Sequence, residues 1–237
     1  NNDDIVLIKT DMEGLQLSTK RIRMEGDQVP YAIIKTVDEG FVIAGHHNHT
    51  DHQQNFLMKL NGNMEVTWTK LFSYQDDIRF HMLRQDANGN IFYGADVFMG
   101  TFPDILLIKF DPEGNKVWQK TWSNNNNDHI YDIHFAADGK LYVVASIWTG
   151  SSAEMVLFCL DENGQSIYTK SLFQDKNYYP RTFLSLGNNK TMLIGRAHYP
   201  TETALVIFDK DFNVTGTKLV SGTDGELLLE SGVVYND

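Results

Sequence analysis

The sequence predicts an all-β fold made of one supersecondary unit repeated along the chain, and three observations support this prediction. Lys20, Lys70, Lys120 and Lys170 stand 50 residues apart, and each ends a similar phrase of two strands and a turn. Short apolar runs alternate with tight turns throughout. No segment has a convincing helical period. A repeat of this length made of strands and turns is typical of a β-propeller.

The first hairpin of each repeat consists of an apolar strand, a short turn, and a strand that ends near an aromatic residue and a lysine. Its clearest copies are residues 105–120 and 155–170. The turns at 11–14, 111–114 and 161–164 begin with Asp, which caps a bend, and end with Gly, which accepts a positive φ. In the second repeat this turn reads Asn61-Gly62-Asn63. The phrase therefore predicts one antiparallel strand pair per repeat.

The second hairpin of each repeat pairs two apolar runs across a polar turn. Together with the first hairpin it would make a four-stranded antiparallel blade. The four copies comprise residues 31–35 with 41–45, 78–84 with 91–95, 130–135 with 141–145, and 182–186 with 191–195.

Several predicted strands are apolar at successive positions. Residues 5–8 and 205–208 are examples. Such runs indicate strands buried on both faces, as expected where each blade lies between two others. Trp68, Trp118 and Tyr168 share one phase of the repeat, and we expect their rings to fill the wedge between adjacent blades.

The two ends of the chain each carry half a repeat. Residues 4–21 resemble the third and fourth strands of a blade, and residues 226–230 with 232–235 resemble the first and second. Pairing these halves would complete a fifth blade and remove exposed edge strands. We therefore expect one domain over residues 1–237, with blades at 30–72, 77–122, 129–173 and 180–219 and a closing blade that joins 224–237 to 4–22. The alternative is an excerpt of a longer propeller of about six to eight blades.

The repeat pattern resembles the propeller repeats of secreted or lipid-anchored bacterial proteins, akin to kelch-like and quinoprotein-type blades. The resemblance covers nearly the whole chain, but its motif is structural. Members of such families are mostly binding or scaffold modules, so the resemblance implies recognition and transfers no site residue. A bound quinone cofactor would imply a larger ring than 237 residues can build.

Composition narrows the range of partners. The formal net charge of −11 disfavours binding to nucleic-acid phosphates or to anionic membranes, because like charges repel. No apolar run approaches the length of a membrane span. The single cysteine, Cys159, excludes an intrachain disulfide, and its place in an apolar strand predicts an inert packing role.

A histidine-rich loop is the most distinctive local feature. His46, His47, His49 and His52 are four of the eight histidines and fall between two strands of one predicted blade. Imidazoles this dense can supply nitrogen ligands to a divalent metal such as Zn²⁺, although the spacing matches no established zinc motif. The alternative is a solvated loop, and no other cofactor is expected.

Aromatic residues in the predicted loops suggest a binding face. Such rings serve sugar stacking or a protein hot spot, and they also serve packing above a core. Trp148 is the strongest single candidate. The other candidate ligand-binding residues of this kind are Phe98, Tyr178, Tyr179 and Tyr199.

Asp and Asn recur just before the innermost predicted strand of each repeat, at Asp27, Asp77, Asn127 and Asn177. Their side chains could converge on a cation such as Ca²⁺ or on a polar ligand. Turn preference explains the same residues. We include Asp27 and Asp77 among the expected ligand-binding residues.

No catalytic signature stands out, so the sequence predicts that the chain is not an enzyme. The predicted function is a non-catalytic recognition or scaffold module that binds a protein or a glycan, exported to the periplasm, the cell surface or beyond, and part of a larger chain or assembly. A first alternative is a five-bladed glycosidase with Asp77 or Asp27 opposite Asp128 or Glu202, which requires carboxyl groups about 5 to 9.5 Å apart. A second alternative is a structural component of a surface assembly.

Overall fold

The structure is a computed structural model that describes residues 3–49, 52–73, 78–98, 100–173, 177–197 and 202–221. For His49, His52 and Gln53 it describes the backbone alone. In these ranges the chain consists of strands, turns and bends without a helix, which confirms the predicted all-β class. Accordingly, no helix among these residues could cross a membrane.

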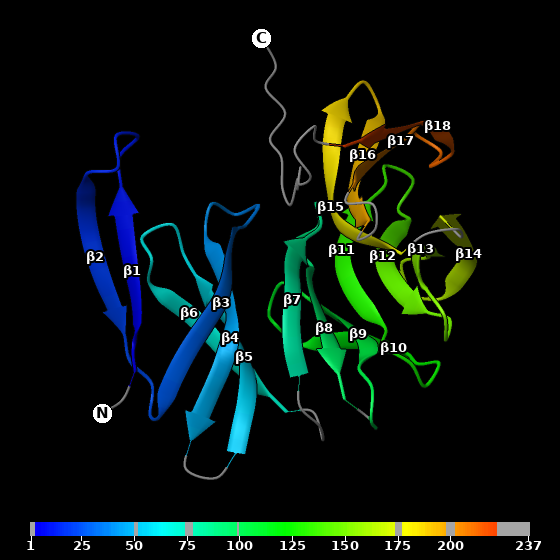
Figure 1. Cartoon of the computed structure of the whole chain (residues 1–237). Coiled ribbons are helices and arrows are strands. Elements are labelled where there is room, and N and C mark those ends of the chain that lie inside the picture. Colours follow the sequence, from blue (N-terminus) through cyan, green and yellow to red (C-terminus); the bar gives the residue numbers. More distant parts are fainter. Residues whose placement is uncertain are drawn as a thin grey trace. The chain divides into compact units, whose positions relative to one another are not determined.

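The described residues form 18 strands in five antiparallel sheets (Figure 1). One sheet has two strands, β1 (Ile5–Thr10) and β2 (Gln16–Ile22), and the other four have four strands each. In every four-stranded sheet the strands follow one another in chain order, as predicted for a propeller-like repeat. The four sheets contain β3 (Asp27–Lys35), β4 (Phe41–His49), β5 (His52–Leu60) and β6 (Val66–Phe72); β7 (Ile78–Gln85), β8 (Ile91–Val97), β9 (Asp104–Phe110) and β10 (Lys116–Trp122); β11 (His129–Phe135), β12 (Leu141–Trp148), β13 (Ala153–Leu160) and β14 (Ser166–Phe173); and β15 (Tyr178–Gly187), β16 (Lys190–Ala197), β17 (Glu202–Phe208) and β18 (Val214–Val220).

The chain divides into two compact units, and each is described by itself. Unit 1 comprises Asn1–Tyr93 and Lys109–Val117, and unit 2 comprises Gly94–Ile108 and Trp118–Asp237. The sheet of β7 to β10 therefore contributes strands to both units.

In unit 1, the two-stranded sheet packs beside β3 to β6. Ile5 and Ile22 join a buried cluster with Ile43, Phe56 and Met58. Farther along β1 the side chains become exposed: 48% of Val6 and 60% of Ile8 is accessible to solvent. Residues 55–60 of β5, at the same repeat position, are all buried. The β1–β2 sheet is thus covered much less than the corresponding strands of the next sheet.

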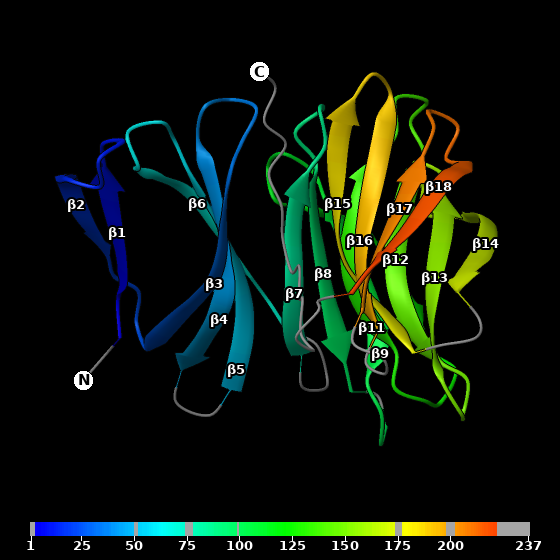
Figure 2. The same ribbon diagram turned by 45° about the horizontal axis from the view of Figure 1, so that its top comes forward.

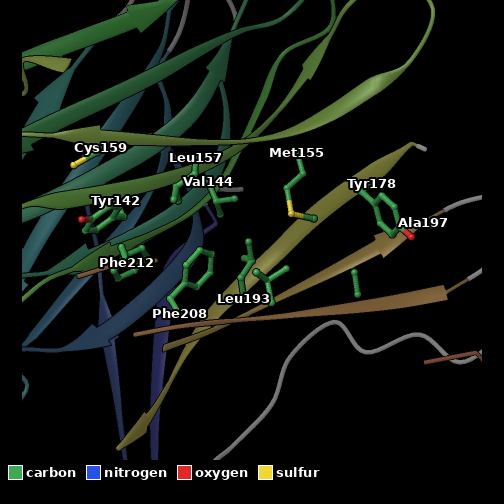
Figure 3. Close-up of a cluster of buried hydrophobic side chains, with 12 residues drawn as sticks. Tyr142, Val144, Met155, Leu157, Cys159, Tyr178, Leu193, Ala197, Phe208 and Phe212 are labelled. Atoms are coloured by element: carbon green, nitrogen blue, oxygen red, sulfur yellow. The ribbon is translucent and has the colours of Figure 1, made fainter. Parts of the chain in front are cut away.

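In unit 2, the sheets β11 to β14 and β15 to β18 lie side by side (Figure 2). Their shared core is built from alternate residues of β12 and β13 on one side and from β16 and β17 on the other (Figure 3). Cys159 is fully buried in it, as the apolar run around it predicts. The buried members of this core are Tyr142, Val144, Met155, Leu157, Cys159, Tyr178, Leu193, Ala197, Ala204, Val206, Phe208 and Phe212.

The aromatic residue of the fourth strand packs against the turn glycine of the following repeat. A Cβ atom added to Gly114 would lie 2.9 Å from the ring of Trp68, and one added to Gly164 would lie 3.1 Å from the ring of Trp118. Trp118 Nε1 also donates a hydrogen bond of 3.2 Å to the carbonyl of Glu162. These contacts agree with the predicted wedge packing of the two tryptophans. Tyr168 differs, because 39% of it is exposed.

The fourth residue of this turn has a positive φ in all five described copies. Three copies use glycine, as expected, but Met64 (φ 61°) and Phe212 (φ 59°) adopt the same conformation. A bulky residue in the left-handed region needs support from its surroundings. Phe212 receives it from Tyr142, whose ring stacks on it at a centroid distance of 3.6 Å and an interplanar angle of 7°.

Several sequence predictions lie outside the described residues. The predicted closing strands, residues 226–230 and 232–235, belong to this set, so five blades and the closure of a ring stay predictions. The same holds for Asp77 and Tyr199.

Candidate functional site

A β-bulge recurs at one repeat position on the first strand of three sheets. The register shifts at Tyr31 in β3, at Tyr131 in β11 and at Arg181 in β15. These residues stand 50 apart, and His81 occupies the same repeat position in β7. A bulge leaves one residue unpaired and redirects its side chain. The repeat therefore presents one residue of variable chemistry at a conserved place in the strand.

A second variable position lies on the neighbouring strand of each sheet. It is occupied by His46, Asp96, Ser146 and Arg196, again 50 residues apart. In unit 2, His129 pairs with Ser146 and Tyr179 pairs with Arg196 across the strands, two residues before the bulges. The bulge positions and these facing positions bring polar side chains together. We call the six unit 2 residues Asp96, His129, Tyr131, Tyr179, Arg181 and Arg196 the bulge cluster.

Asp96 and His129 form the acidic part of the bulge cluster. Asp96 is buried on β8, and its Oδ2 lies 2.6 Å from His129 Nδ1 at the start of β11. Its Oδ1 accepts a hydrogen bond from the Ile130 N–H at 3.3 Å. A carboxylate that contacts Nδ1 fixes the orientation of the imidazole ring. It also favours the neutral tautomer that carries its proton on Nδ1. This pair supplies one imidazole and one carboxylate as possible metal ligands.

Arg181 and Tyr131 form the centre of the bulge cluster. The Arg181 Cζ lies over the Tyr131 ring, 5.5 Å from the centroid, which is a cation–π geometry. Burial raises the pKa of Tyr131, and the nearby charge of Asp96 raises it further, whereas Arg181 lowers it. Tyr131 is therefore a neutral hydroxyl within electrostatic reach of both charges.

Arg196 on β16 forms the basic edge of the bulge cluster. It lies opposite Tyr179 on the paired strand β15. The Arg196 Nε is buried and makes no hydrogen bond to any residue that the structure describes. Guanidinium groups present five N–H donors in a rigid plane and stay charged at any physiological pH. An arginine in this state is a candidate to hold an anionic or strongly accepting ligand group.

Asp128 lies beside the cluster and holds the end of β12 in place. It is buried, its N–H donates to the Pro103 carbonyl at 3.0 Å, and its Oδ1 accepts the Trp148 N–H at 3.1 Å. Burial raises the pKa of Asp128 to about 6, with a further contribution from the charge of Asp104. The Trp148 N–H and His129 oppose this rise. Asp128 thus changes its protonation about 2 pH units above an ordinary aspartate, near pH 6.

Among the predicted aromatic ligands, Trp148, Tyr179 and Phe98 are partly exposed at strand ends. Tyr178 lies in the core instead, with 2% exposed, and its ring packs 4.3 Å from that of Phe173. The alternation of a strand explains the difference, because successive residues point to opposite faces. Tyr178 therefore departs from the expected exposed position, while Tyr179 fulfils it.

The predicted ring of acidic and amide residues makes contacts between sheets. Asp27 Oδ1 accepts the Asp3 N–H at 3.0 Å, and Asn177 Oδ1 accepts the Ala153 N–H at 2.7 Å. In both cases the acceptor residue follows the donor residue by 24 positions. The same hydrogen bond therefore recurs at one position of the repeat. A ligand role for Asp27 remains a prediction.

The metal site expected at His46, His47, His49 and His52 stays a prediction, and the structure describes the side chains of His46 and His47. His46 Nδ1 is hydrogen bonded to the Tyr31 hydroxyl, and buried His47 contacts the Glu25 carbonyl through Nε2. The two histidines are neighbours in an extended strand and therefore point to opposite faces. His49 and His52 pair through their backbones across the hairpin. His46 and His47 thus do not converge on one ion.

Comparisons with known proteins show the fold. No protein-family model and no curated protein sequence matches the chain. A solved member of the DUF4221 family from Bacteroides vulgatus is similar over 92% of this chain and 75% of that one, with 12% identity and a TM-score of 0.53. Cobalt-substituted apocarotenoid oxygenase from Synechocystis is similar over 95% and 57%, with 11% identity and a TM-score of 0.55. A variant of puromycin hydrolase is similar over 88% and 33%, with 12% identity and a TM-score of 0.58.

These neighbours support a propeller-like fold of repeated four-stranded sheets, without confirming kelch or quinoprotein repeats. They also correct one prediction. From the lack of a catalytic signature we predicted that the chain is not an enzyme, but an oxygenase and a hydrolase have similar folds. That inference was wrong, because the fold leaves catalysis open and chemistry depends on the site.

Of the bulge cluster, Tyr179 alone was among the residues predicted for the site. A signal was present in the repeat itself. Positions 31, 81, 131 and 181 and positions 46, 96, 146 and 196 carry Tyr, His, Arg, Asp or Ser, and each of them follows proline, glycine or an apolar residue. Variation at a fixed phase of a regular repeat marks positions that packing does not dictate.

Proposed function

We propose that the chain is a recognition domain that binds a glycan at the bulge cluster of unit 2. The observation that carries the proposal is the placement of Arg181 over Tyr131, with Tyr179 on the same strand as Arg181 and with Arg196 opposite Tyr179 on the paired strand β16. Sugar sites combine aromatic faces with a few fixed hydrogen-bonding groups, and this set supplies both.

The surrounding residues support this proposal. Trp148 lies on the same strand as Ser146, two residues farther along, so both side chains emerge on one face of β12. Two hydrogen bonds fix the backbone of Trp148. Its N–H donates to Asp128 Oδ1, and its carbonyl accepts from the Asn124 side-chain amide at 3.1 Å. A partly exposed indole on a fixed backbone suits stacking on a sugar ring.

A glycan-array screen followed by calorimetry tests the proposal. We expect Trp148→Ala to weaken binding of a detected oligosaccharide about three- to tenfold, in line with the energy of an aromatic contact. Tyr168→Ala, which removes a partly exposed ring from β14, is the matched control and should leave the affinity unchanged. Equal loss in both variants, or binding to proteins and to no glycan, would contradict the proposal.

A second candidate function is glycoside hydrolysis, and the state of Asp128 favours it. A glycosidase needs one carboxyl group that is protonated near neutral pH and a second that is ionised. Asp128 has the raised pKa of such an acid, and Asp104 lies within its electrostatic reach. Turnover of chromogenic glycosides that is lost in Asp128→Asn would establish this function, and absence of turnover in the wild-type chain would exclude it.

We also propose that the propeller has five blades and closes through its chain ends. The supporting observations are the two-stranded β1–β2 sheet and the exposure of Val6 and Ile8 on β1. Aligning the turn residues 230–232 with the turn residues 38–40 matches Val234 to Val42, and the 50-residue repeat matches Lys9 to Lys59. Val42 pairs with Lys59 in the β3 to β6 sheet. Lys9→Cys with Val234→Cys should therefore form an intramolecular disulfide, whereas Leu17→Cys with Val234→Cys should not. A disulfide-linked dimer from the first pair would overturn closure within one chain.

A further inference from the structure

We infer that the group held by the bulge cluster is an oxyanion, such as a carboxylate, a sulfate or a phosphate, and that Arg196 and Arg181 bind it. This inference rests on the proposed function and names the chemistry of its ligand. It would make the chain a receptor for acidic ligands, although its overall charge is −11.

The first argument is the state of Arg196. Its Nε is buried and donates no hydrogen bond within the described part of the chain. Its charge has no salt-bridge partner among those residues. Removing a charged donor from water without a partner is costly, and an oxyanion restores the lost interactions. The planar guanidinium fits carboxylate, sulfate and phosphate oxygens in pairs.

The second argument is the placement of two arginines on one strand pair. Arg181 and Arg196 come from one strand pair, with Arg196 opposite Tyr179 and Arg181 at the bulge that follows. The carboxylate of Asp96 is directed at His129 and the Ile130 N–H. Both guanidinium groups therefore come from the strand pair that carries Tyr179. The hydroxyls of Tyr131 and Tyr179 add neutral donors for the remaining ligand oxygens.

Calorimetry on the full chain tests the inference with glucuronate, sulfate and phosphate as probes. Glucose and sodium chloride at matched ionic strength serve as controls. We expect at least one oxyanion to bind, and Arg196→Gln to weaken it about tenfold or more. Arg23→Gln should leave the affinity unchanged, because Arg23 is a largely exposed arginine paired with Asp4. Preference for glucuronate would identify an acidic sugar, and preference for sulfate or phosphate an esterified ligand.

The outcomes separate this inference from the proposed function. Binding of a neutral oligosaccharide that depends on Trp148 but not on Arg196 would contradict the inference of an oxyanion ligand. The proposal of glycan recognition would still stand. A thermal-shift measurement with each variant checks that it is folded. If no oxyanion binds and Arg196→Gln lowers the melting temperature of the free chain, the arginine has a partner within the protein and the inference fails. Oxyanion binding with equal affinity in Arg23→Gln and Arg196→Gln would overturn it as well.

Discussion

The carboxylate of Asp132 on β11 accepts a hydrogen bond of 2.8 Å from the Thr182 hydroxyl on β15, which is 50 residues later in the chain. The same oxygen, Oδ2, accepts the Phe183 N–H at 2.9 Å, and Oδ1 accepts the Ile133 N–H at 2.9 Å. Asp132 is buried, so these three donors depend on it. This carboxylate joins the first strands of two adjacent sheets in unit 2 and supports the strands that carry the bulge cluster.

Replacing Asp132 should therefore destabilise the protein. We expect Asp132→Ala to lower the free energy of unfolding by about 2 to 4 kcal/mol, because it leaves buried donors without an acceptor. Urea denaturation measures the change. Asp138→Ala, at an exposed turn where the carboxylate contacts Lys140, should cost less than about 1 kcal/mol. Similar losses in the two variants would show that Asp132 is not a structural link.

The raised pKa of Asp128 predicts a pH dependence of stability. Between the ordinary value of 3.8 and the folded value of about 6, the folded chain binds more protons at this site than the unfolded chain does. The contribution of Asp128 to stability is therefore present at acid pH and falls as the pH rises through this window. Relative to Asp128→Asn, the wild type should lose about 1 to 3 kcal/mol between pH 4 and pH 7. A difference between the two proteins that stays constant with pH would contradict the raised pKa.

The contact between Trp118 and Gly164 predicts a coupling between them. Gly164→Ala meets both a positive φ of 72° and the indole at 3.1 Å. Gly14→Ala has the same turn position and a φ of 83° but open space around it, so it measures the backbone cost alone, about 1 kcal/mol. We expect Gly164→Ala to cost more in urea denaturation. In a Trp118→Ala background the excess should disappear, and its persistence would mean that the ring is not the cause.

Cys159 should resist modification in the folded chain. It is fully buried in the unit 2 core, and burial raises its pKa, so little reactive thiolate forms. A thiol reagent such as Ellman's reagent should react with it at a negligible rate in buffer and rapidly in denaturant. Fast reaction in buffer would show that the core opens readily.

Most of the local structure could be predicted from the sequence alone. The Asp and Gly turns, the apolar runs and the 50-residue phase predicted strand pairs such as 105–110 with 116–120 because these signals act between residues close in the chain. It also placed Cys159 correctly in a core. Period-2 alternation could not be assigned in runs that are apolar throughout, so Tyr178 was expected at the surface and Tyr179 was not distinguished from it.

What the sequence by itself determined is therefore the repeat and its strands, because turn chemistry and apolar patterning are read from neighbouring residues. The tertiary structure decided which polar groups meet. Asp96 and His129 are 33 residues apart in the chain, and they come within 2.6 Å because two different sheets bring their strands together. The bulges that redirect Tyr131 and Arg181 depend on strand register, and the pKa of Asp128 depends on burial. These are properties of packing, and no local pattern encodes them.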